Sequence, residues 1–316
     1  MCGWRAELSQ LSLALCKVSL RCAAPLYSVP AVDDAPRFHV GCRMAKRLQL
    51  IMFLAVLGSG SSLFAQVYLL ADGVSDTYAL INSVLGGTAE EVPDCSHPDF
   101  GPHITQAFDA EVATYTFVFS IHVTPDNDRC VALDRQRNEI KTYGPSPAYL
   151  KGFYGDTVTF RWRFRLAEGF QPSPSFTHIH QIKAGDGDAT APILTLTPRR
   201  STPDRLQLIH VDSAGHSTTV ATAALAPLEG TWVEAYEQIT YGYNGSYAIT
   251  LTKVSDGSVL LSYQNNNIDL WRTGTTFVRP KWGIYRSLNN PQYLRDEDVL
   301  FQGFCLAKGT DDCPPW

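Results

Sequence analysis

The segment from Val158 to Leu166, with the sequence VTFRWRFRL, constrains the fold more than any other part of the chain. Apolar and basic residues alternate along it, so the apolar side chains share one face and three arginines share the other. A period of two is typical of a β-strand with one buried face. We interpret the row of Arg161, Arg163 and Arg165 as a solvated outer face, with a surface for a polyanion as the alternative.

Strong turn signals divide the following part of the chain into hairpins. Asn244-Gly245 and Asp256-Gly257 stand between alternating segments, as in β-hairpins. No long amphipathic helix is predicted, and only a short helix is expected at 76–85. We therefore predict an all-β sandwich, a β-jelly roll of two antiparallel sheets. The expected strands are 115–123, 158–166, 176–184, 192–196, 206–211, 232–241, 247–253 and 259–263.

The N-terminal part has the features of an export signal. After Met44, a basic pair precedes an apolar run from Leu48 to Leu57, and a small-residue cleavage site ends before Gln66. The run is shorter than the roughly 20 residues of a membrane-spanning helix. We therefore expect an over-extended start at 1–43, a signal peptide at 44–65 and a single domain at 66–316. The protein is then secreted or periplasmic, without a membrane anchor.

The expected mature chain keeps four cysteines, Cys95, Cys130, Cys305 and Cys313. An even number in an oxidising compartment favours disulfides, although four cysteines allow three connectivities. We favour the pairs Cys95–Cys130 and Cys305–Cys313. The formal net charge of −5 argues against nucleic acid as a partner. It does not exclude an anionic substrate, which local clusters of charge would bind. We expect a monomer without a cofactor.

Two segments place polar side chains on one face of a strand. Along RQRNEIKTY, alternation aligns Arg137, Glu139 and Lys141. Taken alone, this row is explained equally well by an exposed sheet face. Along FTHIHQIKA, alternation puts His178 and His180 on one face. Two histidines at this spacing, followed by a lysine, favour a functional site over a structural role.

A third segment, VRPKWGIYR, aligns Lys281, Gly283 and Tyr285 on one face of a strand. A glycine between a lysine and a tyrosine leaves room for a ligand to lie flat against the strand. A close approach of two backbones within the core is the alternative explanation of this glycine.

The segments RNEIK, HIH and KWGIY occur in this order and resemble strands of jelly-roll polysaccharide lyases, such as alginate lyases and the related glucuronan lyases. The resemblance spans Arg135 to Tyr285. It implies a concanavalin-like jelly roll that cleaves a uronic-acid polysaccharide by β-elimination. The family usually has glutamine where this chain has His178. Either His178 or Gln181, brought in by a bulge, would then neutralise the carboxylate of the substrate.

The resemblance also implies a role for each residue. Tyr285 would protonate the glycosidic oxygen and, in a syn elimination, also act as the base, with His180 as the alternative base. Arg137, with its planar guanidinium, would bind the carboxylate of the sugar, and Glu139 would orient Arg137. We expect an acidic polysaccharide to contact, in addition to the catalytic residues, Glu139, Lys141, Gln181, Lys183, Arg279 and Lys281.

Other functions make different demands. A glycoside hydrolase needs two carboxylates at the cleft, but Glu234 and Glu237 are three apart on a strand and point to opposite faces. A cupin-like metal enzyme would use both histidines of HIH as ligands, and no glutamate follows at the expected short spacing. A non-catalytic carbohydrate-binding module would share the fold and would use the aromatic residues Trp232, Trp271 and Tyr243.

Two short runs of the sequence hold residue types that can bind a metal ion. Asp186 and Asp188, in the GDGD loop, are candidate calcium ligands, with a polar turn as the simpler explanation. His97 and His103, in the run PDCSHPDFGPHI, are interpreted as surface or loop-packing residues rather than ligands.

Overall fold

The computed structural model describes residues 66–316, so the expected signal peptide at 44–65 and the segment 1–43 lie outside the described residues. The eight-stranded sheet contains β1 (Val67–Leu70), β3 (Ile104–Asp109), β4 (Thr114–Ile121), β6 (Thr157–Leu166), β11 (Val233–Thr240), β12 (Gly245–Lys253), β13 (Val259–Ile268) and β15 (Glu297–Lys308). The seven-stranded sheet contains β2 (Glu90–Glu91), β5 (Arg135–Lys141), β7 (Thr177–Ala184), β8 (Leu194–Arg199), β9 (Arg205–Val211), β10 (Ser217–Ala224) and β14 (Val278–Ser287).

The helical elements are short: α1 (Thr77–Leu85) and the 3-10 turns η1 (Ala148–Leu150), η2 (Ala226–Leu228) and η3 (Pro291–Tyr293). Helix α1 begins where the Asp76 carboxylate accepts a hydrogen bond of 2.8 Å from the amide of Ala79, which confirms the helix expected at 76–85. Among residues 66–316, no helix combines the length and the hydropathy needed to cross a membrane.

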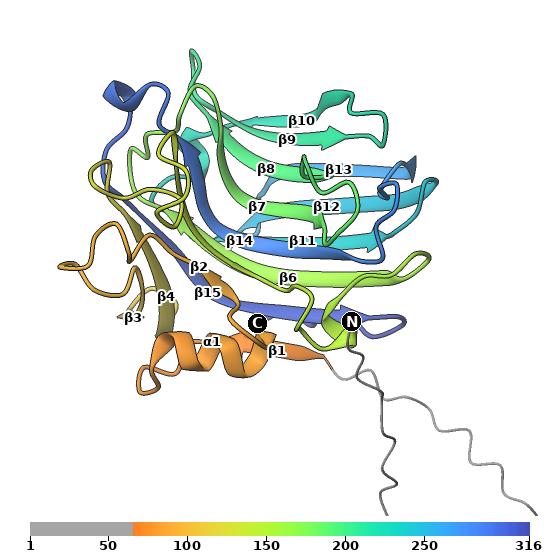
Figure 1. Ribbon diagram of the computed structural model, residues 1–316, viewed down its shortest axis with the longest axis horizontal. Coiled ribbons are helices and arrows are strands. Elements are labelled where there is room, and N and C mark those ends of the chain that lie inside the picture. The colour runs from red at the N-terminus through yellow and green to blue at the C-terminus, as the bar shows by residue number, and fades with distance from the viewer. Residues whose placement is uncertain (1–65) are drawn as a thin grey trace, which may run out of the picture. The chain divides into compact units, whose positions relative to one another are not determined.

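The two sheets form two layers, as Figure 1 shows. The eight-stranded sheet has the order β13-β12-β11-β6-β15-β4-β3, with β1 also paired to β15, and the seven-stranded sheet has the order β10-β9-β8-β7-β14-β5-β2. All pairings between these named strands are antiparallel. The predicted sandwich of two antiparallel sheets is therefore confirmed.

Strand β6 carries the alternation that predicted the two layers. Phe160, Trp162 and Phe164 are buried between the sheets, and the ring of Phe160 lies 5.7 Å from that of Trp282 in the opposite sheet. The arginines of β6 lie on the outer face, where Arg163 pairs with Glu234 at 2.9 Å. Arg161 pairs with the same glutamate and Arg165 with Asp109. The basic row is thus neutralised on the outer face by acidic neighbours.

Both favoured disulfides are present, Cys95–Cys130 and Cys305–Cys313. Cys305 lies in β15, which is hydrogen-bonded to β4 and β6 inside the eight-stranded sheet. The strands β1, β2, β3, β10 and β15 are additions to the predicted set, whereas β11, β12 and β13 form the predicted meander of hairpins. Disulfides form in oxidising compartments, which is consistent with an exported chain.

Candidate active site

A pocket of about 250 Å³ opens on the face of the seven-stranded sheet that points away from the core. Strand β14 lies between β5 and β7, so the three segments singled out in the sequence are hydrogen-bonded neighbours. In register, Tyr285 stands beside Arg137 of β5 and His178 of β7. The pocket is lined by Arg135, Arg137, Phe176, His178, Gln181, Lys183, Thr190, Ala191, Pro192 and Tyr285.

Two arginines surround the half-buried Tyr285. Arg135 donates a hydrogen bond of 3.1 Å from Nη1 to the phenol oxygen. The guanidinium carbon of Arg137 lies 3.7 Å from the centre of the ring. Because the phenol oxygen already accepts from Arg135, its own hydrogen is free to be donated to a ligand in the pocket. Negative charge that develops on this oxygen would be stabilised by both guanidinium groups.

The two histidines of β7 lie on opposite faces of the sheet. His178 pairs with Tyr285 but His180 pairs with Trp282, and the register between β7 and β14 shifts between these two pairs. Tyr285 and Trp282 are three apart and point to opposite faces, so their partners do as well. The prediction that both histidines share one face is therefore wrong, because a β-bulge interrupts the alternation.

His180 belongs to the core between the sheets and is 1 % exposed. Its Nδ1 lies 2.9 Å from the carbonyl oxygen of Lys281, and its Nε2 lies 3.0 Å from Glu237 of β11. The ring packs between Trp162 and Trp282, at 5.1 and 5.4 Å. His180 does not reach the cleft, so the role of base implied for it does not fit this structure. Glu234 and Glu237 do point to opposite faces, as predicted.

His178 and Gln181 both face the cleft. The ring of His178 is stacked on Phe176 at 5.1 Å, and its buried Nδ1 has no hydrogen-bond partner among residues 66–316. Burial, together with Arg199 and Arg137, lowers the pKa of His178 to about 3 although Glu139 opposes the shift. The imidazole is therefore neutral near pH 7. Gln181 donates to Glu139, so the bulge brings this glutamine to the cleft face.

A buried network of ion pairs lies beside the pocket. Glu139 is fully buried, and its carboxylate lies 2.6 Å from both Arg137 and Lys281. Arg137 also donates to Asp128 at 2.9 Å. Although burial opposes ionisation, Lys281 and Arg137 hold the pKa of Glu139 below its usual range. This geometry accords with the expectation that Glu139 orients Arg137.

Glu91 completes this network, and the sequence did not predict it as a site residue. It lies 2.5 Å from Lys281 and 2.8 Å from Lys141. It belongs to β2, which has only two residues and thus gives no periodic signal. Lys281 is 2 % exposed and is held between two carboxylates, so it is an internal counter-ion rather than a contact for a neighbouring uronate. The substrate-binding role expected for Lys281 is corrected accordingly.

Two further cations have no carboxylate partner. Lys183 and Arg279 are neighbours in register, and no carboxylate of the described residues lies within ion-pair distance of either. Nε and Nη1 of Arg279 are buried without a hydrogen-bond partner in the described part of the chain. Burial, reinforced by Lys281 and Arg279, lowers the pKa of Lys183 to about 8. The cleft therefore presents positive charge that residues 66–316 do not neutralise by ion pairs.

Gly283 serves the backbone rather than a ligand. Its φ of +141° lies in a region that favours glycine, and a Cβ atom would collide with the Asn138 carbonyl and lie 2.7 Å from the Cα of Glu139. The close approach of β14 and β5 explains this glycine. The alternative explanation, a close approach of two backbones, therefore accounts for Gly283, and no ligand has to be invoked.

Most of the residues considered for a carbohydrate-binding module or a calcium site are buried or hydrogen-bonded within the protein. Trp232 and Trp271 are buried, so of the three aromatic residues proposed as a sugar platform only Tyr243 is exposed. Asp186 accepts hydrogen bonds of 2.9 Å from the Thr275 hydroxyl and 2.6 Å from the Thr276 amide. It thus fastens one loop to another, as a polar turn residue does.

No protein-family model matches the sequence, and a search of the curated proteins finds no match. Solved structures with a similar backbone include endo-β-1,4-glucuronan lyase from the fungus Trichoderma reesei, with 15 % identity, 66 % of this chain and 88 % of that chain covered, and a TM-score of 0.46. The marine alginate lyase from Aplysia kurodai has 13 % identity, coverage of 70 % and 98 %, and a TM-score of 0.45. An alginate lyase from Pseudomonas aeruginosa has 13 % identity, coverage of 70 % and 97 %, and a TM-score of 0.46. At these identities and TM-scores, nothing about the chemistry of this chain follows from the likeness, and the side chains of the cleft have to supply it.

Proposed function

We propose that this chain is a polysaccharide lyase that cleaves a uronic-acid-containing polysaccharide, of the alginate or glucuronan class, by β-elimination. One observation carries the proposal: the Tyr285 hydroxyl lies between Arg135 and Arg137 in a pocket that Lys183 also lines, and within residues 66–316 Lys183 has no carboxylate at ion-pair distance. A proton donor surrounded by cations suits an anionic substrate that loses one proton and gains another.

The unpaired cations favour a polyanion along the sheet. Leaving a charge desolvated without a partner is costly, and a bound carboxylate would remove that cost at Lys183 and Arg279. Residues two apart on a strand are separated by about 6.5 Å, so Gln181 and Lys183 contact successive parts of an extended chain. The pocket therefore supports binding of a sugar polymer with repeated carboxylates rather than of one small acid.

The elimination requires three events at the uronate. Arg137 uses Nε for Asp128 and Nη1 for Glu139, which leaves Nη2 to bind the sugar carboxylate and make the C5 proton more acidic. Tyr285 enters this step as its phenolate, whose oxygen takes the C5 proton and becomes a neutral phenol. The electron pair of that C–H bond forms the C4–C5 double bond, the bond from C4 to the glycosidic oxygen breaks, and Tyr285 returns the proton to that oxygen.

His178 assists as a neutral group in this scheme. Its low pKa makes it a weak base, so we assign the proton transfers to Tyr285. A neutral imidazole can still donate one hydrogen bond to the carboxylate as that group gains negative charge. Gln181 stands on the same face, and its side-chain amide, which donates one N–H to Glu139, has a second N–H for the sugar carboxylate.

A hydrolase mechanism fits the site less well. Glu91 and Glu139 both lie beside the pocket and contact the same lysine. Burial opposes their ionisation, but Lys281 and Arg137 hold the pKa of each below its usual range. A glycosidase needs one carboxylic acid that keeps its proton near neutral pH. Neither glutamate meets that requirement.

The compartment follows from the disulfides and the N-terminal sequence. Two disulfides within residues 66–316 favour an oxidising environment. We therefore place the activity outside the cytosol, in the medium or in a periplasm.

The test is to incubate the protein with glucuronan, polymannuronate and polyguluronate and to follow the ultraviolet absorbance of the unsaturated product. We expect absorbance and new reducing ends to appear together on at least one polymer. Reducing ends without the absorbance would indicate hydrolysis. Binding of a polymer without either signal would indicate a carbohydrate-binding module.

Tyr285→Phe separates catalysis from folding. The variant keeps the ring beneath Arg137 and loses only the hydroxyl, so turnover should fall by about 10²- to 10⁴-fold while thermal stability changes little. Tyr236→Phe is the matched control, because Tyr236 also lies under an arginine, at 4.4 Å, but on the outer face of the other sheet. Retained turnover in Tyr285→Phe, or an equal loss in Tyr236→Phe, would contradict the assignment.

A further inference from the structure

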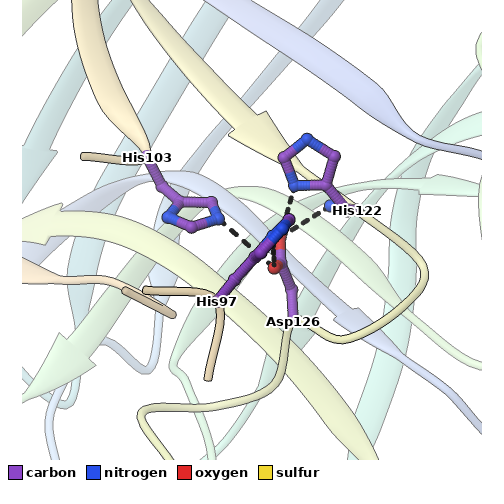
Figure 2. A group of neighbouring side chains, drawn as sticks. All are labelled: His97, His103, His122 and Asp126. Atoms are coloured by element: carbon purple, nitrogen blue, oxygen red, sulfur yellow. Dashed lines mark hydrogen bonds and ion pairs between the residues drawn. The ribbon is translucent and has the colours of Figure 1, made fainter. Parts of the chain in front are cut away.

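Three histidines converge on one buried carboxylate at the end of the sandwich, as Figure 2 shows. His97 comes from the loop after β2, His103 from the residue before β3, and His122 from the residue after β4. Their nitrogens lie 3.0, 3.2 and 3.0 Å from the carboxylate of Asp126. The sequence indicated that His97 and His103 are surface or loop-packing residues rather than ligands, but the fold gathers them with His122 into one cluster.

The spacing of these atoms suits a metal ion. Four ligand atoms, one from each residue, all lie within 4.8 Å of one another. Bonds of 2.0–2.1 Å to Zn²⁺ in a tetrahedron place neighbouring ligand atoms about 3.3 Å apart. The three N···O distances are already near that value. The side chains of His97 and His122 are partly exposed, so small movements can complete the tetrahedron.

The charges in the cluster also call for a cation. Asp126 is fully buried, and within residues 66–316 its carboxylate has only histidines at ion-pair distance. His103 stands between two carboxylates, with Nδ1 at 2.8 Å from Asp94 and Nε2 at 3.2 Å from Asp126. A neutral imidazole has one N–H group, so one of these contacts would set a nitrogen lone pair against a carboxylate. Either an additional proton or a metal ion removes that conflict.

The surroundings resemble those of a ligated histidine. A carboxylate on the far nitrogen, as Asp94 provides for His103, commonly fixes the ring of a metal ligand. The ring of Phe100 lies 4.6 Å from His103 and 4.3 Å from His122, and so covers the cluster with an apolar group. The disulfide Cys95–Cys130 joins the two loops that supply His97 and Asp126.

The cluster is connected to the candidate active site through β5. Gln136 donates to the Asp126 carbonyl at 3.0 Å, and Asn138 donates to the His103 carbonyl at 2.8 Å. Arg137 lies between these two residues, on the cleft face, and donates to Asp128 in the same loop as Asp126. A metal ion at the cluster would therefore fix the loop that holds Arg137 in place.

We propose that His97, His103, His122 and Asp126 form a structural Zn²⁺ site that fastens the two loops to β5. Imidazole nitrogens and one carboxylate are ligands that suit Zn²⁺, and four protein ligands make a closed structural site. The proposal does not rest on the proposed lyase activity, because the role of the ion is to hold two loops of the fold, one of which also holds Arg137 through Asp128.

The experiment measures metal directly on the protein, purified without a histidine tag. After treatment with a chelator, Zn²⁺ is titrated by calorimetry, bound metal is counted by mass spectrometry, and Co²⁺ serves as a probe of tetrahedral geometry through its visible absorption. We expect about one Zn²⁺ per chain and a rise in the melting temperature on binding. No saturable uptake of Zn²⁺ by the folded chain would overturn the proposal.

Variants locate the site. Asp94→Asn should weaken Zn²⁺ binding by roughly 10- to 100-fold, as for loss of an outer carboxylate, and Asp126→Asn should weaken it further. His97→Gln, at a partly exposed position, keeps the test valid if Asp126→Asn fails to fold. His216→Gln is the matched control. His216 pairs with Asp212, four residues away, as His122 does with Asp126, but it lies on the surface. Unchanged affinity in His97→Gln, or equal loss in His216→Gln, would contradict the assignment.

Discussion

Replacing Glu139 by glutamine removes one negative charge from the centre of the buried network beside Tyr285. The side chain of Glu139 has no exposed surface, and it pairs with Arg137 and Lys281 at 2.6 Å each. Glu91 would remain beside Lys281, but it also serves Lys141. Glutamine keeps the shape and loses the charge, so the effect reports on electrostatics rather than on packing.

The expected magnitude follows from the burial of the pair. Breaking a buried ion pair by removing one partner costs about 3–5 kcal/mol, because a desolvated charge is left without compensation. For a domain of this size each kcal/mol moves the melting temperature by about 2–4 °C, so we expect a fall of roughly 6–20 °C. Glu111→Gln is the control: Glu111 pairs with Arg165 at 3.4 Å on the surface, with 46 % of its side chain exposed, and should cost at most about 1 kcal/mol.

The assay is urea unfolding at pH 7 with the disulfides intact, followed by circular dichroism. The same comparison at lower pH provides a second check. Because Lys281 and Arg137 hold the pKa of Glu139 below its usual range despite burial, its contribution to the free energy of unfolding is present above the pKa of an unfolded glutamate. It is lost as the pH falls through the lower pKa of the folded state. The difference between wild type and Glu139→Gln should therefore shrink on acidification.

A loss in Glu139→Gln no larger than that in Glu111→Gln would refute this account of the network. A difference that stays constant from pH 7 down to the acid limit would refute the explanation through the carboxylate charge. The first result would mean that Lys281 and Arg137 find compensation elsewhere.

Further predictions concern the cleft and its backbone. Lys183 has a pKa of about 8, so it loses its charge as the pH rises through that value, and the KM for a uronate polymer should increase above pH 8. Lys183→Arg stays charged and should remove this pH dependence of KM; an unchanged profile would exclude Lys183 as a substrate contact. Gly283→Ala should lower the free energy of unfolding by at least about 1–3 kcal/mol, because φ is +141° and β5 lies against the new methyl group. Gly144→Ala, with no neighbouring atom within 4 Å, is its control in the same unfolding assay, and similar losses in both would contradict the explanation.

Local pattern predicted the strands that carry the site. Alternation in Arg135 to Lys141 and in Val278 to Ser287 placed Arg137 and Tyr285 on cleft-facing positions, and both residues line the pocket. The periodicity works there because the two strands pair without a register shift. Glu91 escaped detection because a strand of two residues has no period to read.

The sequence by itself determined the two-sheet β-fold, the hairpin meander and the residue types gathered in the cleft, because these depend on alternation and turn chemistry within short segments. Only the tertiary structure decided that His178 faces the pocket and His180 the core, since a register shift between β7 and β14 reverses the faces. It also decided that His97, His103 and His122 meet at Asp126. Such contacts join segments far apart in the chain, and no local pattern records which loops the packing of two sheets will bring together.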